Sequence, residues 1–118
     1  EGKPELADAY FADNDIIAAS AVQSLQHNGF RIPEDVSVIG FDDSSICTIL
    51  TPCLTTVRYD LNGMAQLATL RLIDMIESPT PHEIIKSTVG TKLIQRQSVA
   101  PYFEEKPLID SNHQKSEQ

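Results

Sequence analysis

A strand, a helix and a second strand follow one another in the first forty residues, and this order narrows the possible folds. Residues 9–12 are apolar, and residues 36–41 are apolar and rich in β-branched side chains. Both segments predict buried strands, the second buried on both faces as in a parallel sheet. Between them, apolar side chains recur at steps of three and four along residues 16–28, as on one face of a helix. Together they predict a βαβ unit with a right-handed crossover.

The rest of the chain continues this alternation of strands and helices. Residues 54–59 predict a third strand, after which Asp60 can cap a second helix that runs to Ser78. Residues 88–99 alternate loosely and predict a long or bent strand. The second helix carries one apolar stripe, formed by Leu61, Met64, Ala65, Ala68, Leu72, Met75 and Ile76. We therefore expect an α/β fold built on a parallel sheet.

Length and charge exclude several classes of protein. The 118 residues suit one small domain, which we place at residues 1–103, and the polar residues 104–118 predict a disordered tail. A net charge of −8, most of it in the first sixty residues, argues against direct contact with nucleic acid. No apolar run approaches the roughly 20 residues of a membrane span. Cys47 and Cys53 fit thiols in a reducing cytoplasm, with a disulfide as the alternative.

Two adjacent carboxylates, Asp42 and Asp43, follow the second strand, and residues 13–15 place Asp, Asn and Asp after the first. In open α/β sheets, ligands bind outside the carboxyl ends of the strands. The same residue types also cap helices and form turns. The residues themselves therefore leave two interpretations open, a structural role and a polar binding site.

Three kinds of chemistry could use such a site. Clustered acids bind Mg²⁺, but a phosphoacceptor site would also need a lysine at a later strand end, and Lys92 lies inside a strand pattern. Acid–base catalysis would need the side chains of Asp42 and Asp43 to contact the same substrate. Neighbouring side chains on a strand point to opposite faces of the sheet, so the two carboxylates cannot easily do so. The third is recognition of a polar small molecule, because Asp42 accepts hydrogen bonds and Asn14 both donates and accepts them.

Other motifs of catalysis or cofactor binding are missing. His27, His82 and His113 are too scattered for a metal site, and the two cysteines lack partners at zinc spacing. The sequence has no glycine-rich phosphate loop and no nucleophile elbow. We therefore expect no catalytic residue, no metal and no cofactor.

Three stretches of the sequence closely resemble one family of bacterial transcription regulators. In order, they read FADNDIIAASAVQSLQHNGFRIPEDVSVIGFDD, TPCLTTVRYD and LIQRQSVAP. These motifs, in this order and spacing, are similar to those of the lactose-repressor/galactose-repressor (LacI/GalR) family. The resemblance implies the last third of such a regulator, which is the C-terminal portion of its periplasmic-binding-protein-like domain, and this domain binds a sugar or nucleobase effector. It also implies a homodimer or higher oligomer, and DNA binding only through an N-terminal headpiece that this chain lacks. A periplasmic solute-binding fragment is the alternative, and an enzyme of the same fold comes third.

The resemblance also assigns roles to individual residues. The ligand-contacting asparagine and aspartate of the family fall on Asn14 and Asp42, and Asp43 would then serve the turn. In the family, the segment after the third strand crosses to another subdomain. We therefore expect the second helix to lack its partner sheet and the isolated chain to oligomerise through its apolar stripe. The dimer contact of the family maps to Ala19, Val22, Ile46, Ile49 and Leu50.

Overall fold

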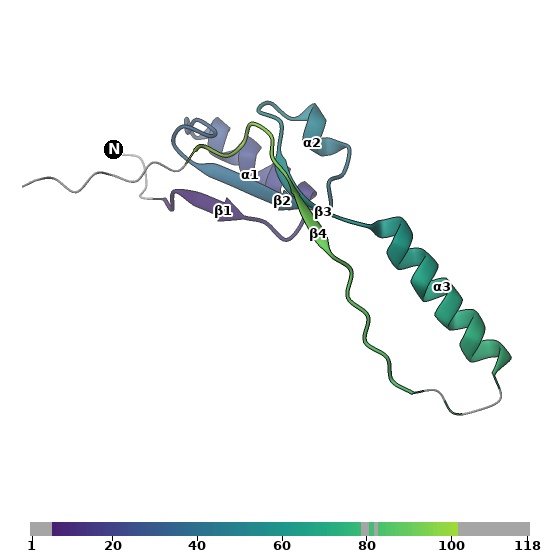
Figure 1. Ribbon diagram of the computed structural model, residues 1–118. Helices are drawn as coiled ribbons and strands as arrows, with labels where there is room; N and C mark the ends of the chain where they lie inside the picture. Colours follow the sequence, from purple (N-terminus) through teal and green to yellow (C-terminus); the bar gives the residue numbers. More distant parts are fainter. Residues whose placement is uncertain (1–5, 79–80, 82, 102–118) are drawn as a thin grey trace, which may run out of the picture.

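A four-stranded sheet forms the body of the protein (Figure 1). The computed structural model describes residues 6–78, 81 and 83–101. The strands lie in sequence order across the sheet; the first three are parallel, and the fourth is antiparallel to the third. They are β1 (Ala9–Phe11), β2 (Ser37–Phe41), β3 (Thr55–Tyr59) and β4 (Thr91–Ile94). The expected α/β fold with parallel strands is confirmed.

Three helices follow the strands of the sheet. They are α1 (Asp15–His27), α2 (Ile46–Ile49) and α3 (Leu61–Glu77). Helix α1 begins where the side chain of Asn14 accepts a hydrogen bond from the backbone N–H of Ile17 at 2.9 Å, and α3 begins where Asp60 does the same for Gly63 at 3.0 Å. Because α1 joins the parallel strands β1 and β2, the predicted βαβ unit is present.

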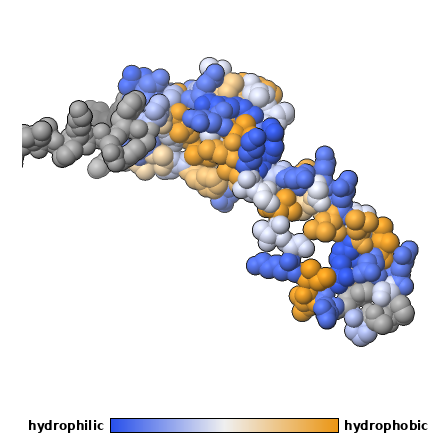
Figure 2. All heavy atoms as spheres, viewed as in Figure 1, coloured by the Kyte–Doolittle hydropathy of each residue, from blue (hydrophilic) through white to orange (hydrophobic). Residues whose placement is uncertain are grey.

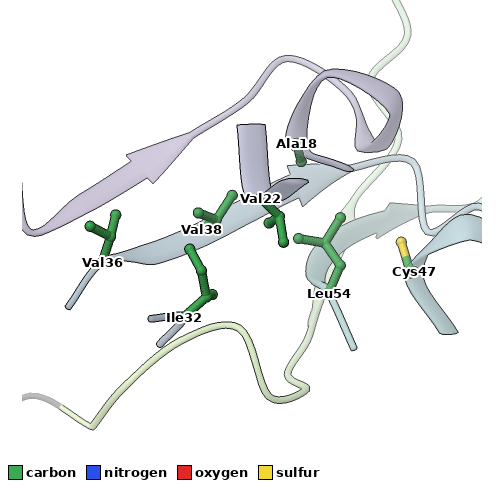
Figure 3. Close-up of a cluster of buried hydrophobic side chains, with 7 residues drawn as sticks. All are labelled: Ala18, Val22, Ile32, Val36, Val38, Cys47 and Leu54. Carbon is green, nitrogen blue, oxygen red and sulfur yellow. The ribbon is translucent and has the colours of Figure 1, made fainter. Parts of the chain in front are cut away.

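One small apolar core lies between α1 and the sheet, with α2 at its end (Figure 3). Val22 of α1 and Leu54, just before β3, are fully buried and point toward each other in the close-up. The complete cluster comprises Ala18, Val22, Ile32, Val36, Val38, Cys47 and Leu54. Burial raises the pKa of the Cys47 thiol to about 11, with a smaller contribution from a hydrogen bond to Asp15, so this cysteine is an unreactive core residue. Cys47 and Cys53 are not joined by a disulfide.

Two predictions about strand burial are wrong. All three residues of β1 are exposed, including Phe11 at 62%, because β1 is the edge strand and no described residue covers its outer side. In β2, Val38 and Gly40 are buried, but Ser37, Ile39 and Phe41 alternate with them and are only partly buried. Helix α1 packs against one face of the sheet, so the apolar residues of the opposite face keep part of their exposure.

The last described segment is shorter as a strand than residues 88–99 predicted. Strand β4 ends at Ile94, and the chain then binds the sheet through Ser98 instead of extending the ladder. The buried Ser98 hydroxyl donates to the carbonyl of Val38 at 2.6 Å and accepts from the N–H of Thr55 at 2.9 Å. The Ser98 hydroxyl therefore links β2 to the start of β3, and the Ser98 carbonyl also accepts from the N–H of Val38 at 2.9 Å. The predicted domain end at residue 103 and the tail lie outside the described residues.

Helix α3 extends away from the sheet as an arm, and none of its residues is buried (Figure 1). Apolar side chains gather along α3 and along the chain that returns to β4 (Figure 2). The stripe has therefore formed on a helix but has not folded back onto the sheet. Oligomerisation through this stripe stays a prediction.

A buried carboxylate, that of Asp15, connects three elements next to the core. It lies in the first turn of α1 and is 1% exposed. It accepts hydrogen bonds from the Thr56 hydroxyl at 2.6 Å and from the N–H and hydroxyl of Ser44 at 2.7 and 3.0 Å. Burial on its own raises the pKa of Asp15, but the hydrogen bonds, that of Thr56 foremost, bring it below its usual value. Asp15 thus joins α1 to β3 and to the loop after β2.

Gly40 is the residue that makes room for this carboxylate. A Cβ at Gly40 would overlap Oδ1 of Asp15 and would lie 3.0 Å from Cδ2 of Leu54. Real Cβ atoms essentially never come this close to another heavy atom. A side chain at position 40 would therefore displace α1 or the carboxylate of Asp15. Gly40 therefore marks a close approach of helix to strand and not a phosphate-binding loop.

We predict that Gly40→Ala lowers the free energy of unfolding by about 1–3 kcal/mol, because the added methyl group overpacks the Asp15 contact. Urea unfolding followed by circular dichroism measures this loss. Gly90→Ala is the matched control, because no atom lies within 4 Å of a Cβ at Gly90. The control should leave stability unchanged or raise it by about 0.4–1 kcal/mol. Equal stability of the two variants would contradict the close approach.

We predict that Asp15→Asn lowers the free energy of unfolding at pH 7 by about 1.5–3 kcal/mol, the range for hydrogen bonds to a charged group. Since the pKa of Asp15 is lower in the folded chain than its value of about 3.9 when unfolded, the carboxylate stabilises the fold above that pH. The advantage of wild type over Asp15→Asn should therefore shrink as the pH falls through the folded pKa.

Urea titrations at pH 7, 4 and 3 test the role of Asp15. The control is Asp13→Asn, an exposed acid on the same loop, which should change stability by less than about 0.5 kcal/mol. A difference between wild type and Asp15→Asn that stays constant from pH 7 to pH 3 would show that the charge of Asp15 is not what stabilises the fold.

Candidate ligand-binding site

A cavity of about 710 Å³ lies where the end of the sheet, α3 and the segment returning to β4 meet. Its volume falls within the usual range for small-molecule sites. Apolar and aromatic side chains dominate its lining, and Asp42 and Arg71 are its charged residues. The lining residues are Phe41, Asp42, Tyr59, Leu61, Met64, Leu67, Ala68, Arg71, Ile85, Ser87, Thr88, Val89 and Thr91.

Asp42 reaches this cavity directly after the last residue of β2. Its side chain is exposed, and its backbone N–H donates to the carbonyl of Val57 on β3 at 2.9 Å. Its φ of 114° lies in the region that L-residues rarely adopt, and Asp43 follows at 55°. The chain therefore turns sharply at the strand end, and the two carboxylates have different surroundings. Asp42 faces the cavity, as expected from its position at a carboxyl end of the sheet.

Asp43 takes part in an ion-pair cluster instead. Its side chain is 6% exposed and binds Nη2 of Arg96 at 2.6 Å and Nε of Arg58 at 2.5 Å. Burial on its own raises the pKa of Asp43, but Arg96 and then Arg58 hold it below its usual value. A carboxylate this firmly paired is not free to bind a ligand, and its contacts support a role in the turn.

Asn14 has a structural role that is visible in the structure. Its side-chain oxygen caps α1, and Asn14 is not among the residues that line the cavity. The amide group of Asn14 is therefore partly engaged, with its NH₂ group left as a donor. Its ligand-binding role stays a prediction.

The residues predicted for a dimer contact fall into two groups. Val22 and Ala19 are buried in the chain's own core, so they offer almost no surface to a partner. Ile46 and Leu50 are half-buried against the core, whereas Ile49 is 76% exposed. If a partner binds this region, Ile49 is the residue that presents apolar surface to it. The interface itself stays a prediction.

An aromatic pair at the cavity escaped the sequence analysis. Phe41 of β2 and Tyr59 of β3 stack with ring centroids 5.7 Å apart and an angle of 22° between the rings. Both are the last residues of parallel neighbouring strands, and this shared position is the signal that could have predicted their contact. Arg71 was also missed; it pairs with Asp74 at 2.6 Å and donates to the carbonyl of Glu83 at 3.0 Å. Its contact with residue 83 joins α3 to the returning segment.

The described residues offer no metal site and no membrane span. Within residues 6–78, 81 and 83–101, no three His, Cys, Asp or Glu side chains are grouped so that they could hold a metal ion. None of the helices in the same ranges combines the length and apolar character needed to cross a bilayer. The cavity itself offers one exposed carboxylate, one guanidinium group, the hydroxyl groups of Ser87, Thr88, Thr91 and Tyr59, and an apolar, aromatic wall.

Comparison with known proteins agrees with this fold. The model of the periplasmic binding protein-like domain family matches residues 1–99. A curated relative, the NTD biosynthesis operon regulator NtdR of Bacillus subtilis (strain 168), is 40% identical over 92 residues, which cover 76% of this chain and 27% of that protein. The chain spans about a quarter of the length of the curated relatives it matches.

Solved structures of LacI-type regulators share the arrangement. One is the periplasmic binding protein/LacI transcriptional regulator from Alkaliphilus metalliredigens QYMF complexed with D-xylulofuranose, with a TM-score of 0.72 and 34% identity over 80% of this chain and 35% of that one. Another is the transcriptional regulator CelR–cellobiose complex, with a TM-score of 0.72 and 34% identity over 77% of this chain and 28% of that one. The chain therefore belongs to the periplasmic binding protein-like domain family, in the form found in LacI-family transcriptional regulators.

Proposed function

We propose that this chain is the effector-binding and dimerisation portion of a bacterial transcription regulator, in which a sugar or similar polar small molecule tunes operator affinity. The observation that carries the proposal is the exposed Asp42 carboxylate in the lining of a mainly apolar cavity. A sugar has an apolar C–H face and hydroxyl groups at its edge. The Phe41–Tyr59 pair can contact the first, and Asp42 can accept hydrogen bonds from the second.

The complexes of related regulators support the sugar class. Two of the similar structures hold D-xylulofuranose and cellobiose. A nucleobase is the competing ligand class, because its flat ring could also stack on Phe41 or Tyr59 while Asp42 accepts from a ring N–H. The site binds its ligand and does not convert it, since the related proteins are regulators and the cavity pairs no general base with a nucleophile.

The charge of the chain assigns DNA binding to another part of the regulator. A net charge of −8 repels the phosphate backbone, so this portion would act on DNA only through a basic headpiece elsewhere in the regulator. Such a regulator would work in the bacterial cytoplasm, where its operator lies.

We predict that Asp42→Ala weakens effector binding by ten- to a hundredfold in the full-length gene product, because it removes a charged hydrogen-bonding group worth about 1.5–3 kcal/mol. A thermal-shift screen with D-glucose, D-xylulose, cellobiose, adenine and guanine finds the ligand, and calorimetry measures its affinity. Asp13→Ala, the exposed acid outside the cavity, is the control and should bind as wild type does. Wild-type affinity in Asp42→Ala would rule out Asp42 as a ligand contact.

The role of Asn14 needs a variant that keeps the helix cap. Asn14→Ala should cost about 1 kcal/mol of stability through loss of the cap, whatever the ligand does. Asn14→Asp keeps an oxygen that accepts from Ile17, replaces the NH₂ donor with a second acceptor oxygen and adds a negative charge. If Asn14 binds the effector, Asn14→Asp should keep the melting temperature of the free protein and lose affinity.

We predict that Ile49→Asp converts the regulator from dimer to monomer, because it places a charge in the most exposed apolar position of the proposed contact. Analytical ultracentrifugation over a range of protein concentrations measures the oligomeric state. Phe11→Asp is the matched control, since Phe11 is 62% exposed on β1 and lies outside both the proposed contact and the apolar stripe of α3. An unchanged dimer in Ile49→Asp would place the interface elsewhere.

A further inference from the structure

The carboxylate of Asp43 joins parts of the chain that are distant in sequence. It pairs with Arg58, the fourth residue of β3, and with Arg96, two residues after β4. Arg96 also donates to the carbonyl of Leu54 at 2.9 Å, which fixes its guanidinium against the start of β3. We refer to Asp43, Arg58 and Arg96 as the turn clamp. The Asp43 side chain is 6% and that of Arg96 18% exposed, so water competes less for this pair than for the pair with Arg58, which is 56% exposed.

The position of the turn clamp connects the cavity with the arm. Strand β3 leads into α3, and β4 receives the chain that comes back from it, so these strands are the two connections between the sheet and the arm (Figure 1). Arg58 stands opposite Lys92 in the antiparallel register, which sets two cations side by side. Asp43 supplies the negative charge that offsets them. The same residue directly follows Asp42.

The backbone at this turn needs outside contacts to hold it. Asp42 and Asp43 both have positive φ, at 114° and 55°, and such conformations persist only when their surroundings fix them. The main chain contributes two contacts, the 2.9 Å bond from the Asp42 N–H to Val57 and a 3.3 Å bond from the Asp43 N–H to the Thr56 hydroxyl. Both contacts go to β3. The turn clamp adds the ion pairs and extends the attachment to the segment after β4.

We infer that Asp43 is a positioning residue for the ligand site. Through the turn clamp it holds the conformation that directs the Asp42 carboxylate into the cavity, and it ties that conformation to β3 and to the segment after β4. A change in the orientation of α3 relative to the sheet therefore alters the position of Asp42 through the Arg58–Asp43 pair. The inference deepens the proposed function, since it takes the cavity as the ligand site. The statement that Asp43 holds the turn at Asp42 applies to the chain without a ligand.

Amide hydrogen exchange at pH 7, measured by NMR on the 118-residue chain, tests this role without a ligand. Asp43→Asn removes the charge and keeps a residue that tolerates positive φ. The Asp42 amide should exchange at least tenfold faster in Asp43→Asn than in wild type. The amide of Val38, in the strand β2 that precedes Asp42, should stay within twofold of wild type. The control is Asp35→Asn, which removes the charge from a separate Arg–Asp fork, that with Arg31, and should leave the Asp42 amide unchanged.

Two outcomes would overturn the inference. An Asp42 amide that exchanges as in wild type shows that the main-chain bonds hold the turn alone. An increase shared equally by Asp42 and Val38 shows that Asp43 only stabilises the fold as a whole. If Asp43→Asn does not fold, Arg58→Gln decides, because the Arg58 side chain is more than half exposed and its loss removes one arm of the clamp. It should raise Asp42 exchange at least threefold, and a wild-type rate overturns the inference.

A failed sugar screen would count against the proposed function alone. The exchange experiment contains no ligand, so its result is independent of which molecule, if any, fills the cavity. Conversely, a confirmed sugar ligand combined with wild-type exchange in Asp43→Asn and Arg58→Gln would keep the proposed function and reject the role of Asp43.

Discussion

The burial of the Asp15 carboxylate is the constraint on which the rest of the structure depends. A charge that is 1% exposed requires fixed donors, and these come from β3 and from the loop after β2. Meeting that requirement brings the start of α1 against the end of the sheet. It also explains the glycine at position 40, since any Cβ there would overlap the carboxylate. Apolar packing against Val38 holds α1 against the sheet, and Asp15 sets where along the sheet it begins.

Three neighbouring acids near the carboxyl ends of the strands have three different functions because their surroundings differ. Asp15 is buried and hydrogen-bonded, Asp43 is paired with two arginines, and Asp42 is exposed to the cavity. The first two have lowered pKa values because donors and cations outweigh the effect of burial. They remain charged but are engaged within the chain. Of these three acids, Asp42 is the one whose carboxylate is exposed, so the proposed binding role falls to Asp42 and not to Asp43.

Local patterns were enough to predict part of this arrangement. The strand–helix–strand order, the helix starting close to residues 13–15 and the strand ending at Phe41 all follow from residues close together in the sequence. The burial of β1 and of both faces of β2 could not be predicted this way, because exposure depends on which neighbours cover a strand. The sequence also did not predict that Asp15 is the buried residue among 13–15. Its burial depends on Gly40 and Thr56, which lie far along the chain. Arg96 reaches Asp43 from 53 residues away, a contact that only the folded sheet creates.

Helix α3 shows what local signals can form without tertiary support. Its 17 residues have an N-cap at Asp60 and an ion pair between Arg71 and Asp74, and both features stabilise a helix on its own. None of its side chains is buried, although each large apolar residue would gain about 1.5–3 kcal/mol from burial. Since α3 also forms one wall of the cavity, the shape of the cavity depends on where the arm is held. The turn clamp joins the residue next to Asp42 to β3 and to the segment after β4, so we expect a contact that fixes α3 to act also on the carboxylate at the proposed ligand site.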